Sequence, residues 1–205
     1  MNTIYSFKRL LKPKTIINFL IINLLLLLFT QNSLGQNWYP LGTGTNGDVR
    51  AMTLYSSMLI TAGEFTSVGG ISANRIAAWN GISWQALGLG TNGRISAIIV
   101  FNGELIVAGD FTQVGGVSAS RIAKWNGSNW LLFGNNSSVN NDIYALAVYN
   151  NQLYAAGSFT SIGGQNRSRV AMWDGSAWQP LGLGLNDVAR TLAVYNNELV
   201  AGGDF

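Results

Sequence analysis

The sequence predicts an all-β fold built from repeated four-stranded antiparallel units, and three observations lead to this prediction. The chain of 205 residues is 48% hydrophobic but only 10% charged, and 25 of its residues are glycine. All seven tryptophans fall into rows that recur about every 46 residues. Within each period, short apolar runs are separated by Asn, Gly and Ser, which favour tight turns. This composition excludes a disordered chain and indicates a packed core.

The repeat has the same register in two sets of aromatic residues. Trp38, Trp84, Trp130 and Trp178 are separated by 46, 46 and 48 residues, and Phe65, Phe111, Phe159 and Phe205 by 46, 48 and 46 residues. We therefore divide residues 36–205 into repeats at about 38–83, 84–129 and 130–177, followed by an incomplete repeat at 178–205. Self-similarity at this period is typical of a repeat architecture.

Each repeat is predicted to hold four strands. The first two are joined by two residues that tolerate positive φ, such as Asn102-Gly103, which indicates a hairpin. The last two flank a four-residue turn such as 126–129. The first strands are expected at 49–55, 95–101, 143–149 and 188–195, the second at 58–63, 104–109, 152–157 and 198–203, and, in the first repeat, the third and fourth at 75–79 and 84–87.

Four antiparallel strands in about 46 residues match the size of one β-propeller blade. Runs such as 105–109 and 145–149 are apolar on both faces, as expected when blades stack face to face. A β-solenoid is the alternative, but its coils are shorter and pair in parallel. We expect three full blades plus partial ones, hence a fragment of a larger ring. Exposed blade faces and strand edges would favour self-association of such a fragment.

Three strings resemble the successive signatures of kelch-type, galactose-oxidase-like propellers: LYAAG at 153–157, RVAMWDGSAW at 169–178 and LAVYNNEL at 192–199. More closely, the pattern Ala-Gly-x-Phe-Thr-x-x-Gly-Gly, followed by Arg-x-Ala-x-Trp-Asn/Asp-Gly, is similar to repeats in exported bacterial surface proteins and fungal cell-cortex polarity markers. The Gly-Gly departs from kelch because it lies in the loop after the second strand. The resemblance implies a scaffold without copper chemistry, since the chain has no His or Cys.

The N-terminus has the three-part layout of a secretory signal peptide at 1–35. Lys8, Arg9, Lys12 and Lys14 precede an apolar run at 15–29, which small polar residues follow. An uncleaved membrane anchor is the alternative, but this run is shorter than the roughly 20 residues of a span. From residue 36 onward, eight basic and nine acidic residues give a net charge of 8 − 9 = −1. We expect a secreted or cell-surface protein, bacterial in origin, with no membrane span after cleavage.

Several classes of function are excluded by residue types. Without Cys or His, the chain has no thiol nucleophile, no Ser-His-Asp triad and no zinc site of the usual ligands. We therefore expect no metal and no cofactor. A nucleic-acid partner is not expected either, because Lys124 is the sole lysine after the signal peptide and no basic stripe is present.

Residues that recur in every repeat are expected to hold the blades together. The tryptophans that flank each four-residue turn should pack on each other, although exposed rings could instead stack on sugars. Glu64 with Arg75, and Asp110 with Arg121, have the spacing of cross-strand ion pairs. The alternative is that Arg75, Arg121 and Arg169 form a row that binds acidic glycans.

Ligand binding is expected where the repeats differ. Asp48, Arg94, Asp142 and Asp187 stand before the first strands, near the axis, and form the candidate ligand-binding set. No residue is assigned a catalytic role. We therefore expect a non-enzymatic propeller that binds an unknown protein or glycan. The alternative is a carbohydrate-active hydrolase that uses carboxylates at the channel.

We predict that signal cleavage occurs between Gly35 and Gln36, because Ser33 and Gly35 occupy the small-residue positions before the cut. N-terminal sequencing of the exported protein should begin at Gln36 or within a few residues of it. Recovery of the intact N-terminus in membranes would contradict this prediction.

Overall fold

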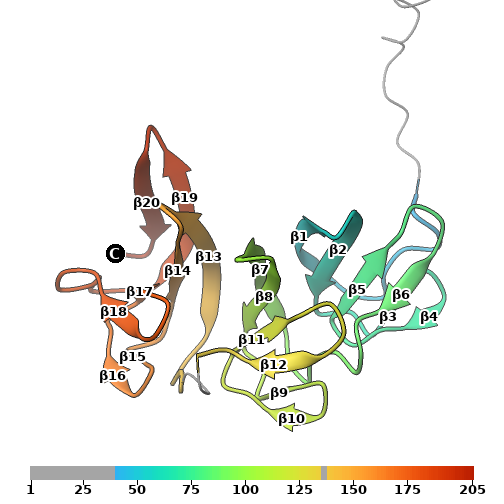
Figure 1. The fold of residues 1–205 in the computed structure, drawn as a ribbon, viewed down its shortest axis with the longest axis horizontal. Coiled ribbons are helices and arrows are strands. Elements are labelled where there is room, and N and C mark those ends of the chain that lie inside the picture. Colours follow the sequence, from blue (N-terminus) through green and yellow to red (C-terminus); the bar gives the residue numbers. More distant parts are fainter. Residues whose placement is uncertain (1–39, 135–137) are drawn as a thin grey trace, which may run out of the picture. The chain divides into compact units, whose positions relative to one another are not determined.

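The computed structural model describes residues 40–134 and 138–205 (Figure 1). The expected signal peptide at 1–35 and the expected strand at Trp38 lie outside the described residues. Pro40–Phe205 form one compact unit.

Three four-stranded antiparallel sheets follow one another along the chain, each a blade. Blade 1 has the order β1 (Val49–Tyr55), β2 (Met58–Gly63), β5 (Ile76–Trp79), β6 (Trp84–Ala86); blade 2 has β7 (Ile95–Phe101), β8 (Glu104–Gly109), β11 (Ile122–Trp125), β12 (Trp130–Leu132); and blade 3 has β13 (Ile143–Tyr149), β14 (Gln152–Gly157), β17 (Val170–Trp173), β18 (Trp178–Pro180). The hairpin of β19 (Ala189–Tyr195) and β20 (Glu198–Gly203) follows them. The all-β class and the four-stranded antiparallel blades are thus confirmed.

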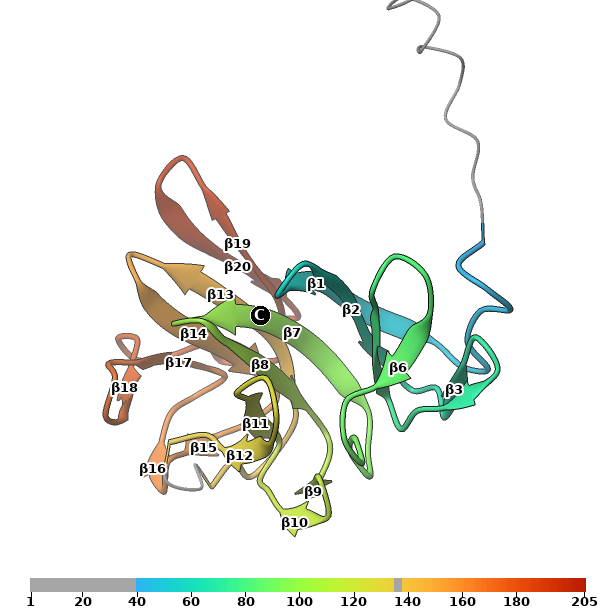
Figure 2. The same cartoon turned by 45° about the vertical axis from the view of Figure 1, so that its right-hand side comes forward.

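The blades pack through their first two strands. β1 lies against β7, β7 against β13 and β13 against β19 (Figure 2). One buried cluster joins Ile60 and Ile76 of blade 1 to Leu105 and Val107 of blade 2, and a second joins blade 2 to blade 3. Both faces of a central blade are therefore buried, which explains why its strands are continuously apolar instead of alternating.

The predicted turns are present. Both residues of each two-residue turn have positive φ, as at Asn150 (48°) and Asn151 (59°), which fits the twist of a tight hairpin. At the four-residue turns, the side chains of Asn80, Asn126 and Asp174 accept hydrogen bonds from the backbone N–H groups of the third and fourth turn residues. The backbone N–H groups of Ala177 and Ser176 hold the pKa of the Asp174 carboxyl well below its usual range.

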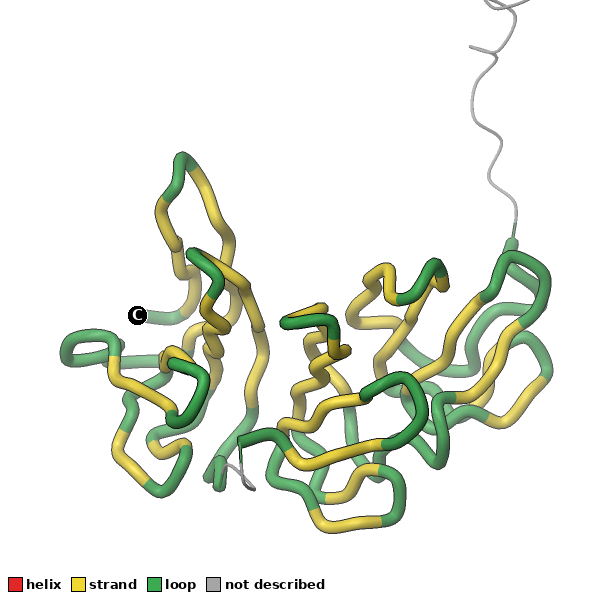
Figure 3. The backbone as a smooth tube through the Cα atoms, in the orientation of Figure 1, coloured by secondary structure: helices red, strands yellow, loops and turns green. Residues whose placement is uncertain are grey.

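Small hairpins that the sequence analysis treated as loops follow the second strands. They are β3 (Ser67–Val68) with β4 (Ile71–Ser72), β9 (Gln113–Val114) with β10 (Val117–Ser118), and β15 (Ser161–Ile162) with β16 (Gln165–Asn166). The Gly-Gly pair forms each turn, and a Cβ on Gly69 would lie 2.3 Å from the ring of Trp84. Among the described residues no helix is present, so none there could cross a membrane (Figure 3).

The recurring tryptophans pack within their blades. The ring centroids of Trp79 and Trp84 are 5.4 Å apart, and the equivalent pairs in blades 2 and 3 are 5.1 and 5.6 Å apart. The indole N–H of Trp130 donates to the carbonyl oxygen of Leu87 at 2.8 Å. Trp130 and Trp178 are only 8% and 3% exposed, so these two rings are packed into the fold.

A second recurring contact joins the segment before each blade to the loop after its second strand. Asn92 accepts hydrogen bonds from the backbone N–H groups of Thr112 and Gln113 and donates to the Thr112 hydroxyl. Asn46 and Asn140 make the same three contacts in blades 1 and 3. This asparagine therefore has a structural role in each complete blade.

The prediction of ion pairs between Glu64 and Arg75 and between Asp110 and Arg121 is wrong. Glu64 contacts Arg50 and Arg94 instead of Arg75, and Asp110 contacts Arg94 instead of Arg121. The third strands begin one residue later than expected, and Arg75, Arg121 and Arg169 precede them with φ of 65°, 61° and 68°. With this left-handed backbone, the Arg121 side chain donates to the carbonyl oxygen of Val139 at 2.9 Å, and the Arg169 side chain donates to the carbonyl oxygen of Ser158 at 2.9 Å.

Every first strand contains a β-bulge at its second residue. In blade 1, Val49 pairs with Gly63 and Ala51 with Ala62, which leaves Arg50 as the extra residue. The extra residues of the other first strands are Ser96, Tyr144 and Arg190. A Cβ on the glycine opposite each bulge would lie 1.9–2.1 Å from the carbonyl oxygen that precedes the first strand, so glycine is required there.

We predict that Gly109→Ala destabilises the fold by about 1–3 kcal/mol, because the added methyl group overpacks the bulge. Its Cβ would lie 2.0 Å from the Arg94 carbonyl oxygen. Denaturant unfolding measures the change, and Ser128→Ala, at an exposed turn, serves as the control within about 0.5 kcal/mol of wild type. Equal stability of the two variants would show that the bulge tolerates a side chain.

Candidate functional site

The four bulged residues converge on one cavity. Arg50, Ser96, Tyr144 and Arg190, together with Arg94, line a cavity of about 360 Å³. Each comes from the start of a different first strand, apart from Arg94, which precedes β7. Because a bulged residue is left out of the regular pairing, its side chain is free to point away from the sheet. One position in the repeat therefore supplies most of the cavity wall.

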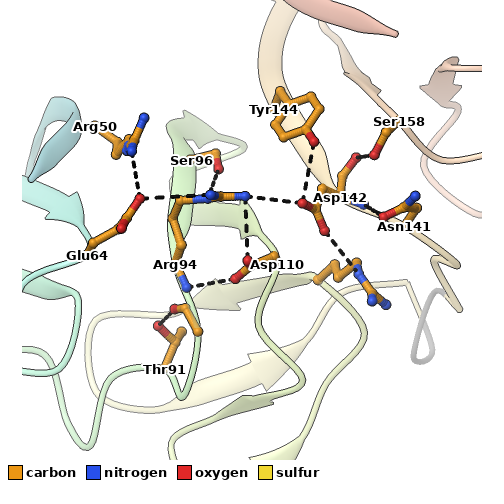
Figure 4. Close-up of polar contacts among 12 residues, drawn as sticks. Arg50, Glu64, Thr91, Arg94, Ser96, Asp110, Asn141, Asp142, Tyr144 and Ser158 are labelled. Carbon is orange, nitrogen blue, oxygen red and sulfur yellow. Dashed lines mark hydrogen bonds and ion pairs between the residues drawn. The ribbon is translucent and has the colours of Figure 1, made fainter. Parts of the chain in front are cut away.

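Arg94 connects three blades through its guanidinium (Figure 4). Nη2 lies 3.1 Å from Asp142 of blade 3 and 3.5 Å from Asp110 of blade 2, and Nη1 lies 3.8 Å from Glu64 of blade 1. Nε donates to the Ser96 hydroxyl at 3.2 Å, and the Arg94 backbone N–H donates to Asp110 at 2.8 Å. This guanidinium therefore connects acids of blades 1, 2 and 3.

Arg50 and Arg190 are more open. Nη2 of Arg50 contacts Glu64 at 2.7 Å and Asp48 at 3.2 Å. Arg190 binds Asp204 through both Nε and Nη2, with 2.7 Å for the Nε contact. This hydrogen-bonded pair raises the pKa of Arg190 and lowers the pKa of Asp204. The side chains of Arg50 and Arg190 are 44% and 62% exposed, so both reach solvent at the cavity.

Asp142 is the most enclosed acid of the cluster, with its side chain 18% exposed. Besides Arg94, it lies 3.6 Å from Nε of Arg121 and accepts a 3.5 Å hydrogen bond from the Tyr144 hydroxyl. Burial makes such an arrangement stable only while the charges stay paired. Asp142 is therefore a structural partner of two arginines from the preceding blade.

The predicted ligand-binding set is brought together in part. Arg94 lines the cavity and pairs with Asp142, and Asp48 pairs with Arg50 behind it. In the first three blades, the carbonyl oxygens of Asp48, Arg94 and Asp142 accept a hydrogen bond from the backbone N–H of the residue after the second strand. In the last hairpin the Val188 carbonyl oxygen accepts this bond, so Val188 holds the equivalent position and Asp187 lies one residue before it. The 46-residue period that relates Asp48 to Arg94 also relates Asp142 to Val188. The Asp187 carboxylate accepts a hydrogen bond from the Val188 backbone N–H at 2.7 Å.

Sequence reasoning missed the bulged residues themselves. Arg50, Ser96, Tyr144 and Arg190 occupy one repeat position and differ in charge and size, while their neighbours are mostly small or apolar. That contrast was readable in the sequence. The bulge was not, because a side chain at the second position of an apolar strand is expected to lie against the neighbouring blade.

Opposite charges nearly cancel around the cavity. The network contains four arginines, Arg50, Arg94, Arg121 and Arg190, and five acids, Asp48, Glu64, Asp110, Asp142 and Asp204, for a sum of 4 − 5 = −1. Within residues 40–134 and 138–205, no group of three or more acids is placed to hold a metal ion. The cavity thus presents arginine donors without a net positive charge.

Comparisons with known proteins agree with this architecture. The family model described as "Domain of unknown function (DUF5122) beta-propeller" matches residues 102–127 and 150–171, which correspond to equivalent parts of blades 2 and 3. The crystal structure of the computationally designed Ika4 protein is similar in fold, with a TM-score of 0.50 and 15% identity, covering 82% of this chain and 92% of that one. No curated protein matches the chain. The fold is a β-propeller; the kelch type stays a prediction.

We predict that Asp142→Asn lowers the free energy of unfolding by about 1–3 kcal/mol, because it removes the acid that Arg121 contacts and the nearest of the three acids around Arg94 in a partly buried site. Asp48→Asn is the matched control: its side chain is 71% exposed, so the loss should stay under about 1 kcal/mol. Chemical denaturation of both variants measures the difference. An equal effect would contradict the central role of Asp142.

Proposed function

We propose that this protein is an exported, non-enzymatic β-propeller module that binds a protein or glycan partner at the cavity where the first strands begin. One observation carries the proposal: a position that varies between otherwise similar blades lines this cavity in four successive first strands. Variable side chains on a rigid, repeated scaffold are the usual arrangement of a binding surface. Export is supported by the charged and apolar segments that begin the chain.

The pairing of the acids supports a binding role over hydrolysis. A carboxylate-dependent glycosidase needs a protonated acid and a second carboxylate that is free to act as base or nucleophile at a suitable separation. Here Asp142 and Glu64 each contact two arginines, and Asp110 contacts Arg94. Each of these three carboxylates is thus engaged by at least one guanidinium group and is not free to act on a substrate.

A steric variant tests the proposal. Ser96→Trp should fill the cavity and abolish saturable binding of its partner, measured with the purified protein on arrays of immobilised glycans and cell-surface proteins. Ile82→Trp adds the same side chain at an 87% exposed turn outside the cavity and should bind like wild type. Melting temperatures of both variants confirm that they are folded.

Turnover separates the two classes of function. The wild-type protein should release no product from a panel of nitrophenyl glycosides. Product release that Asp142→Asn or Ser96→Trp abolishes would overturn the proposal in favour of a hydrolase.

A further inference from the structure

The cavity keeps unused hydrogen-bond donors on two of its arginines. Arginine carries five N–H donors, one on Nε and two on each terminal nitrogen. In the described part of the chain, Arg50 uses Nη2 alone, and Arg190 uses Nε and Nη2 on Asp204. Nε and Nη1 of Arg50 and Nη1 of Arg190 therefore remain for a ligand. Arg94 differs in that Nε and Nη2 hydrogen-bond to Ser96 and Asp142, and Nη1 lies 3.8 Å from Glu64.

Acceptors accompany these donors. Glu64 borders the cavity: it contacts two of the lining residues, Arg50 and Arg94, through Oε1, and within residues 40–134 and 138–205 its Oε2 accepts no hydrogen bond. The Tyr144 hydroxyl makes one long bond of 3.5 Å, to Asp142. A ligand with hydroxyl groups can donate to such a carboxylate and accept from a guanidinium at the same time, so it satisfies both kinds of group.

Charge balance decides against an anionic ligand. Three arginines line the cavity, but each contacts at least one carboxylate. The charges of the four arginines and five acids in the network sum to −1. A carboxylate ligand drawn to Arg190 would meet repulsion from Asp204 on the same guanidinium at similar distance. A neutral ligand takes the remaining donors without displacing Asp48, Glu64 or Asp204.

The volume of the cavity and the residues that line it favour a sugar over a peptide as the ligand. About 360 Å³ lies at the small end of ligand cavities, which suits one sugar ring better than a chain segment. Peptide and protein partners are held chiefly by apolar or aromatic anchors in dry pockets. The described lining contains no aliphatic side chain, and Tyr144 is its one aromatic residue. A polar wall with one aromatic face is suited to a ring that bears hydroxyl groups.

We infer that this cavity binds a neutral sugar residue of a glycan, with Arg50 and Arg190 donating to its hydroxyl oxygens, Glu64 accepting from a hydroxyl, and Tyr144 contacting the ring. The inference deepens the proposed function and rests on it. It assigns the ligand-contacting role to bulged residues of three first strands, and a blade-positioning role to Arg94.

Calorimetric titration of the purified protein tests the inference with three kinds of probe: neutral sugars (galactose, glucose, mannose and N-acetylglucosamine), acidic sugars (glucuronate and N-acetylneuraminate), and a glutamate-rich peptide. At least one neutral sugar should bind, with an affinity that changes less than about twofold between about 50 mM and 500 mM salt, because no net charge is neutralised. Binding of the acidic probes alone, weakening as salt rises, would overturn the inference.

Single variants locate the bound sugar. Arg50→Ala and Arg190→Ala should each weaken binding by about tenfold, since each removes charge-assisted donors. Arg75→Ala is the matched control: this arginine of blade 1 lines a different cavity and should leave the affinity unchanged. Unchanged affinity in both cavity variants would overturn the inference, even if a sugar binds elsewhere.

The outcomes also separate this inference from the proposed function. If no sugar binds but a cell-surface polypeptide binds and is lost in Ser96→Trp, the sugar inference fails and the binding module stands. If a glycoside is cleaved, the proposed function itself fails.

Discussion

The close approach of one carbonyl oxygen to one glycine underlies both the fold and the candidate site. In each first hairpin, a glycine ends the second strand, opposite the bulge. The residue after this glycine donates its backbone N–H to the carbonyl oxygen of the residue before the first strand, at 2.8–3.0 Å. This contact requires the extra residue of the bulge, and a Cβ on the glycine would collide with it. The bulge in turn places one side chain per blade at the cavity. Removing the glycine would therefore disturb the cavity and the hairpin together.

Arg94 shows how the same region joins the blades. Its guanidinium contacts acids from blades 1, 2 and 3, which no apolar side chain could replace without leaving those carboxylates unpaired. The packed apolar clusters supply the adhesion between blades, but they are similar at every interface and do not distinguish one neighbour from another. The charge network differs at every interface. It is therefore suited to setting how successive blades meet at the cavity.

Much of the fold was predictable because repetition amplifies weak local signals. The strands, the two-residue turns and the tryptophan pairs each occur at least three times, so spacing alone identified them. The ion pairs were not predictable in the same way. Ten residues separate Glu64 from Arg75, yet the left-handed backbone at Arg75 and the bulge at Arg50 exchange which arginine faces the acid. The small hairpins were missed because two-residue strands carry no periodicity. Asp187 was misplaced by one residue, since the 46-residue period that relates Asp48 to Arg94 relates Asp142 to Val188.

The bulge also separates stability from specificity. A residue in regular register must satisfy its cross-strand neighbours and the adjoining blade, so its identity is restricted. The bulged residue is outside that pairing, and arginine, serine and tyrosine all occupy it here without a change in the surrounding register. Substitution at this position can therefore alter the cavity while the glycine, the carbonyl contact and the buried strands remain as they are. Arginines at this position add little net charge to the cavity, because Glu64 and Asp204, which follow second strands, contact Arg50 and Arg190. What varies from blade to blade is then chiefly the number of free donors and the shape of the wall, which are the properties that discriminate among hydroxyl-bearing ligands.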